Sequence, residues 1–141
     1  MAETSDGALV AFSHQEGAGG FDLGIALVHD DLSVDPPKTI VQSTDHAEMT
    51  AHIARYGKSY LLAWVAVPGA STFTPLNHNG PTTFAIIDVD GNVLAGPEVV
   101  DVGTNFMDDF VVLANGDVGF LTYAPGALPK PAQVARVRLC E

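Results

Sequence analysis

The chain has 141 residues, of which 47% are hydrophobic and 16% charged, and it contains 14 glycines and 9 prolines. This length and apolar fraction suit one folded domain and exclude a disordered chain, while the low charge and many turn formers favour β-structure. The net charge of −11 would repel a phosphate backbone or an anionic membrane surface, so we expect neither nucleic acid nor a membrane as partner.

The first repeat unit is predicted over residues 7–43. "GALVAFSHQEG" is a short apolar strand with Phe12 near its end, and "FDLGIALVHDDLSVDPPKTIVQS" reads as strand, acidic turn and strand. The acidic turn contains His29, and Pro37 precedes the last strand. Only three strands are predicted here, so we expect this unit to lack its first strand.

The second unit, predicted over residues 47–102, contains four strands. "MTAHIARYGKSYLLAW" reads as a hairpin with a tight turn at Gly57, and "TTFAIIDVDGNVLAGPEVV" reads as a second hairpin with an acidic turn. "DHAEMTAHIARYG" also has helical composition, with Asp45 as a possible N-cap. The strand interpretation is favoured because "DDFVVLANG" aligns with this segment without a gap.

The third unit, predicted over residues 106–141, aligns with the second at an offset of 59 residues. This register places Tyr123 on Trp64, Gly116 on Gly57 and Leu121 on Leu62, and an offset of 52 places Trp64 on Phe12. "AQVARVRLC" supplies one more strand, so we expect this unit to lack its fourth strand.

The predicted fold is therefore a single all-β domain over residues 1–141, with antiparallel four-stranded repeats. The "YLLAW" strand followed by the "FAIIDVDGNVLAG" hairpin resembles the repeats of secreted β-propeller proteins. The resemblance implies about two and a half blades, fewer than the roughly four of a closed ring, and an extracellular or periplasmic location. A β-sandwich or barrel is the alternative. Incomplete units would leave open edges, covered by a second copy of the chain or by a missing segment of a longer one.

Two groups of residues are candidate ligand contacts. Phe12, Trp64 and Tyr123 occupy one equivalent position per unit, where aromatic rings either fill the core or form stacking platforms for a sugar. The long polar segment 68–82 is the second group, because binding residues on β scaffolds concentrate in loops; its candidates are Ser71, Thr72, Thr74, Asn77, His78 and Asn79.

Two metal sites are conceivable. Asp88, Asp90 and Asn92 alternate around a glycine as calcium ligands do, although position twelve of that loop is not the glutamate of an EF-hand, and a hairpin turn explains the same residues. His46, Glu48 and His52 would share one face of a regular strand and form a two-histidine, one-carboxylate site. Apart from calcium, no cofactor is expected.

The sequence favours a binding module over an enzyme. It has no G-x-S-x-G or S-x-x-K motif, and the lone Cys140 lies next to the C-terminus, where we expect fraying rather than a catalytic site. We therefore predict a non-catalytic ligand- or protein-binding module, with carbohydrate as the candidate ligand. The alternatives are a carbohydrate-active hydrolase or lyase that uses Asp108 and Asp109, and a structural repeat that forms oligomers.

Overall fold

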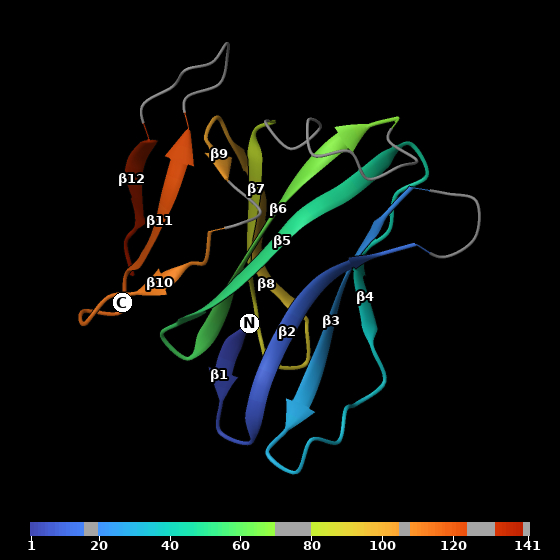
Figure 1. Ribbon diagram of the computed structural model, residues 1–141, viewed down its shortest axis with the longest axis vertical. Helices are drawn as coiled ribbons and strands as arrows, with labels where there is room; N and C mark the ends of the chain where they lie inside the picture. Colours follow the sequence, from blue (N-terminus) through green and yellow to red (C-terminus); the bar gives the residue numbers. More distant parts are fainter. Residues whose placement is uncertain (16–19, 70–79, 105–107, 124–131, 140–141) are drawn as a thin grey trace.

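The computed structural model describes residues 1–15, 20–69, 80–104, 108–123 and 132–139, which contain strands and turns but no helix (Figure 1). The strands form three antiparallel sheets of four strands each, and none of these sheets closes on itself. The prediction of an all-β chain with four-stranded antiparallel sheets is confirmed. Within the described residues, no helix is long and apolar enough to span a membrane.

The first sheet, in the order β1-β2-β3-β4, has a first strand that the sequence analysis missed. Its strands are β1 (Ala2–Thr4), β2 (Gly7–His14), β3 (Asp22–His29) and β4 (Lys38–Val41). β1 pairs with β2 through a two-residue turn, since Thr4 lies opposite Gly7. The expectation that this unit lacks a first strand was wrong because three residues, with Ala2 buried, suffice to extend the sheet.

The second sheet, in the order β5-β6-β7-β8, lies in the middle of the molecule. Its strands are β5 (His46–Tyr56), β6 (Ser59–Pro68), β7 (Thr82–Ile87) and β8 (Val93–Val100). The strand interpretation of "DHAEMTAHIARYG" is confirmed. β5 reads as helix-like in composition because it is buried on both faces: Ile53 lies in one core cluster and Ala54 in the other.

The third sheet is built around β11 (Val118–Tyr123). β12 (Ala132–Val137) pairs with one edge of β11, and β9 (Gly103–Thr104) and β10 (Val111–Val112) both pair with the other edge. The unit therefore starts at Gly103, earlier than the predicted residue 106. In the described part of the chain, no fourth strand pairs with the outer edge of β12.

The first two sheets share one register. Phe12 of β2 lies opposite Gly24 of β3, and Trp64 of β6 lies opposite Thr83 of β7. Phe12 and Trp64 are 52 residues apart, the offset read from the sequence, and Gly24 and Thr83 are 59 residues apart. The acidic turns also correspond: His29 N donates to Ser33 O (2.9 Å) just as Asp88 N donates to Asn92 O (3.0 Å).

The third sheet departs from the gapless alignment by one residue. β5 and β6 are joined by a two-residue turn, since Tyr56 lies opposite Ser59. The β10–β11 turn has three residues, with Leu113 N donating to Asp117 O (2.8 Å) and Gly116 at φ +84°, where an L-residue is strained. A one-residue shift exchanges the two faces of a strand. Thr122 lies five residues after Asp117, the first residue beyond its turn, just as Trp64 lies five residues after Ser59. Thr122 therefore occupies the position of Trp64, and Tyr123 does not.

The three sheets stack in chain order around two core clusters. For each sheet we call the side toward the next sheet along the chain its forward face and the other side its backward face. The forward face of the first sheet, with Leu9 and Ile25, packs on the backward face of the second, with Leu62 and Trp64. The forward face of the second sheet then packs on the backward face of the third. That cluster contains Ala54, Leu61, Phe84, Val118 and Val137.

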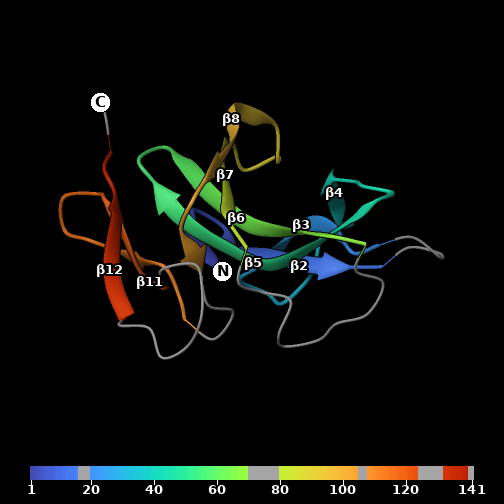
Figure 2. The ribbon, with the colours of Figure 1, turned by 90° about the horizontal axis from the view of Figure 1, so that it is seen from above.

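The stacked sheets spread apart away from β5. β1 and β10 both contact β5. Seen from above, β4, β8 and β12 lie at the periphery, and β5 lies between them (Figure 2). The first strand of the second sheet, β5, therefore contacts the first strand of each neighbouring sheet, whereas the last strands lie apart.

Candidate binding site

A hollow of about 970 Å³ opens where the first strands of the three sheets meet. The β1–β2 turn, the β5–β6 hairpin, the β7–β8 turn and β10 all contribute to its wall. Its charged and aromatic lining residues are Glu3, Asp6, Arg55, Lys58, Tyr60, Asp88 and Phe110. A concave site with convergent polar groups on several rigid elements is typical of ligand sites.

Arg55, in β5, is held in a fixed position on the wall of the hollow. Its Nε donates to Gly57 O (2.7 Å), its Nη1 donates to the Tyr60 hydroxyl (2.9 Å), and its guanidinium carbon lies 5.2 Å from the centre of the Tyr60 ring. Tyr60 itself is fully buried in the core. Because both hydrogen-bond acceptors are neutral, these contacts orient the guanidinium without neutralising its charge.

The carboxylates of the hollow leave the two cations without ion pairs. Among the described residues, no carboxylate oxygen lies within 4.0 Å of an Arg55 or Lys58 nitrogen. Asp6 instead contacts His29, and Asp88 accepts hydrogen bonds from the backbone and side chain of Asn92 (both 2.8 Å). Two of the 6 basic residues of the chain thus line one hollow without ion pairs, beside the carboxylates of Glu3, Asp6 and Asp88.

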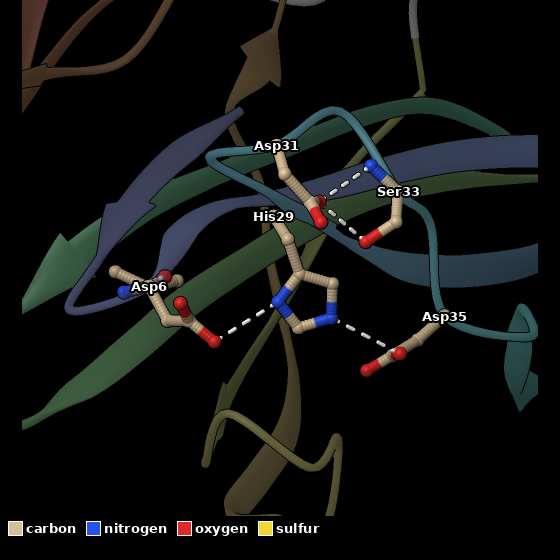
Figure 3. Close-up of polar contacts among 6 residues, drawn as sticks. Asp6, His29, Asp31, Ser33 and Asp35 are labelled. Atoms are coloured by element: carbon tan, nitrogen blue, oxygen red, sulfur yellow. Dashed lines mark hydrogen bonds and ion pairs between the residues drawn. The ribbon is translucent and has the colours of Figure 1, made fainter.

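His29 contacts both the β1–β2 turn and the segment after β3 (Figure 3). Its Nδ1 lies 2.9 Å from Asp6 Oδ2 and its Nε2 lies 3.1 Å from Asp35 Oδ1. A carboxylate only accepts hydrogen bonds, so the protonated ring, in which both nitrogens donate, is the form that makes both contacts. The hydrogen bonds to Asp35 and then Asp6 raise the pKa of His29 above its ordinary value. This contact fixes one wall of the hollow.

The predicted calcium residues form the β7–β8 turn. The side chain and backbone of Asn92 donate hydrogen bonds to the Asp88 carboxylate, and these bonds lower the pKa of Asp88. Gly91 N also donates to the backbone oxygen of Asp88 (3.1 Å). Lys38 Nζ donates to the backbone oxygen of Asp90 (2.7 Å) and to Asn92 Oδ1 (3.3 Å), so an ammonium already contacts the side-chain oxygen of Asn92. The contacts describe a hairpin turn, and calcium binding here stays a prediction.

Trp64 and Glu48 lie on the backward face of the second sheet. Trp64 is 4% exposed and belongs to the core cluster with the first sheet, as the core-packing interpretation predicts. Glu48 is also 4% exposed, and its Oε2 is a buried oxygen without a hydrogen-bond partner. Burial raises the pKa of Glu48, although the electrostatic interaction with His46 and, to a lesser extent, a hydrogen bond with the Trp64 side chain oppose this shift.

His46, Glu48 and His52 do not share a face, so that proposed metal site was wrong. β5 carries a bulge at Thr50, which has φ +54°, and the pairing register shifts between Met49 and His52. The extra residue turns His52 to the forward face, where its ring stacks on Phe110 of the third sheet (5.0 Å between centroids). Among the described residues, no group of three or more His, Cys, Asp or Glu side chains could hold a metal ion.

The remaining residues predicted from the sequence lie outside the hollow or outside the described residues. Ser71, Thr72, Thr74, Asn77, His78 and Asn79 lie outside the described residues. Tyr123 ends β11 opposite Ala132, and its role as a sugar platform stays a prediction. Asp108 is half-buried and Asp109 is exposed, just before Phe110. Phe12, of the predicted aromatic set, lies half-buried on the backward face of the first sheet.

Arg55 and Lys58 were not among the residues predicted from the sequence. The usable signal was their scarcity: the chain has 6 basic residues, and these two flank one tight turn at Gly57. No protein-family model matches the sequence, and no curated protein or solved structure matches it either. The functional conclusion therefore depends on the geometry of the hollow.

Proposed function

We propose that the chain is a non-catalytic binding module made of β-propeller-type blades, with its ligand site in the hollow lined by Arg55 and Lys58. Two observations support blades. Equivalent faces of the first two sheets point the same way along the stack, since Val10 and Leu62 stand at equivalent positions on the two backward faces. In addition, β5 contacts the first strand of the sheet on either side, β1 and β10, while the last strands of the sheets lie apart. An extracellular or periplasmic location belongs to the same proposal, because it follows from the resemblance to secreted propeller repeats.

The observation that carries the binding role is the fixed, unpaired guanidinium of Arg55 beside Lys58. A planar guanidinium oriented by Tyr60 and Gly57 presents its remaining N–H groups to a carboxylate. The lining carboxylates, such as Glu3, offer acceptors for hydroxyl groups. The ligand class that fits both is an acidic carbohydrate, whose carboxylate would contact the cations and whose hydroxyls would contact the carboxylates.

Isothermal titration with glucuronic-acid oligosaccharides, compared with glucose oligosaccharides of equal length, tests the proposal. We expect binding of the acidic series alone. Lys58→Gln, at an exposed position that cannot disturb the core, should weaken it by about tenfold, since a charge-assisted hydrogen bond contributes about 1.5–3 kcal/mol. Arg55→Lys retains the charge but loses the contact geometry, and should weaken it as well.

Arg138→Gln is the matched control, because it removes one positive charge at an exposed position outside the hollow. This variant should bind the acidic oligosaccharide as the unmodified chain does. Equal losses in Lys58→Gln and Arg138→Gln would indicate a nonspecific charge effect. Equal binding of the acidic and neutral series would also contradict the proposal.

A further inference from the structure

The two outer sheets each have one apolar face that no other described sheet covers. On the backward face of the first sheet, Val10, Phe12 and Val28 are half-buried. On the forward face of the third sheet, Leu121 is 39% exposed and Val134, directly opposite it, is 78% exposed. The second sheet, by contrast, is covered on both faces.

The uncovered backward face of the first sheet is equivalent to a face that is already buried within the chain. The shared register places Val10 at the position of Leu62 and Phe12 at the position of Trp64. Both of those second-sheet residues pack against the forward face of the first sheet. The first sheet thus exposes the equivalent of the second-sheet surface that packs against a forward face.

The uncovered forward face of the third sheet is the complementary equivalent. Counted from the turns that precede β6 and β11, Leu121 stands at the position of Ala63, and Val134 stands at the position of Phe84. Phe84 packs toward the third sheet, with its ring 5.8 Å from that of Phe120. The third sheet thus exposes the equivalent of the second-sheet surface that packs against a backward face.

From these equivalences we infer that two copies of this chain associate head to tail, with the forward face of each third sheet packed on the backward face of the partner's first sheet. Two copies supply six sheets, within the four to eight blades of closed propellers. A two-fold axis then closes the ring and buries all four outer faces. The proposed partner is a second copy of the chain, because each chain exposes one forward face and one backward face, the two kinds of face that pack together within the chain.

The net negative charge of the chain opposes this association, and its screening by salt gives a test of it. Each copy carries a net charge of −11, so two copies repel each other at low ionic strength. Screening by salt weakens that repulsion, whereas burial of Val134 and Leu121 is insensitive to screening. The association constant should therefore rise with salt concentration.

Light scattering coupled to size-exclusion chromatography tests the inference on the full chain. We expect twice the 14.7 kDa chain mass, and a shift toward the dimer with added salt. Val134→Asp places a charge in the proposed contact and should weaken association by at least about a hundredfold. Val99→Asp is the matched control: Val99 is 67% exposed on the edge strand β8, outside both outer faces, and this variant should remain dimeric.

Three results would overturn the inference. They are a monomer at every protein and salt concentration, a mass that grows without limit as in an open filament, and a dimer unaffected by Val134→Asp. The inference depends on the blade arrangement of the proposed function and not on its ligand. The two are separated by titrating monomeric Val134→Asp with the acidic oligosaccharide: retained binding supports the hollow whether or not the pair forms.

Discussion

Replacing Leu62 and Leu121 with alanine, one at a time, distinguishes the observed register of the third sheet from the gapless alignment. The alignment makes these two leucines equivalent, because they lie 59 residues apart in matching segments. In the structure they are not equivalent. Leu62 is completely buried between the first and second sheets, whereas Leu121 is 39% exposed on the uncovered face of the third.

The expected costs differ by several kcal/mol. Leu62 contributes to a cluster with Leu9, Ile25 and Trp64, whose backbones are fixed by sheet pairing and cannot collapse into the space that alanine leaves. Truncation of a buried leucine to alanine costs about 2–5 kcal/mol, and a well-ordered site lies in the upper half of that range. Leu121 keeps contact with water in the single chain, so its truncation should cost less than about 1 kcal/mol.

Urea unfolding followed by tryptophan fluorescence gives both free energies of unfolding. The measurement is made at low protein concentration, so that association of Leu121-bearing faces adds nothing to the stability. A large loss for Leu62→Ala with a small loss for Leu121→Ala supports the observed register. Equal losses would show that Leu121 is buried as Leu62 is, and would refute the three-residue turn at Gly116.

Four further predictions concern single side chains. The folded-state pKa of His29 lies above 6.5, so its contribution to stability is complete below that pH and is lost as pH rises through the folded value; His29→Gln should remove this dependence from thermal unfolding curves. The pKa of Glu48 is raised above 4.5, so stability should decline as pH rises through its folded value, and Glu48→Gln should flatten that decline in urea titrations. Leu32 takes φ +69° where the equivalent acidic turn has glycine, and Leu32→Gly should raise stability by up to about 1 kcal/mol, a result that an unchanged melting temperature would contradict. Gly116→Ala should destabilise by about 1–2 kcal/mol, because its φ is +84° and its new Cβ would lie 2.8 Å from the Leu139 side chain; chemical denaturation measures this.

The sequence contained enough information to predict the sheets and the acidic turns. Alternation of apolar residues with turn formers defines antiparallel strands locally, and the His29 and Asp88 turns recur with the same backbone hydrogen bonds. The burial of Trp64 was also foreseeable, since a large ring at a recurring strand position fits a gap between sheets.

Single-residue shifts limited the remaining predictions. The bulge at Thr50 and the extra residue in the Gly116 turn each exchange the faces of a strand, and neither changes the apolar pattern enough to be recognised in one sequence. These shifts decided where His52 and Leu121 point. The hollow escaped prediction for another reason: Arg55 and Glu3 approach it from different sheets, and their proximity depends on how the sheets stack.

Isotope-filtered nuclear Overhauser spectroscopy tests the stacking of sheets most directly. An equal mixture of methyl-labelled and unlabelled copies reports only contacts between chains. Head-to-tail stacking predicts cross-peaks from the Val134 methyls of one copy to the Val10 or Val28 methyls of the other. Cross-peaks that join Val134 to Val134, or none between copies at concentrations where the dimer mass is measured, would contradict it.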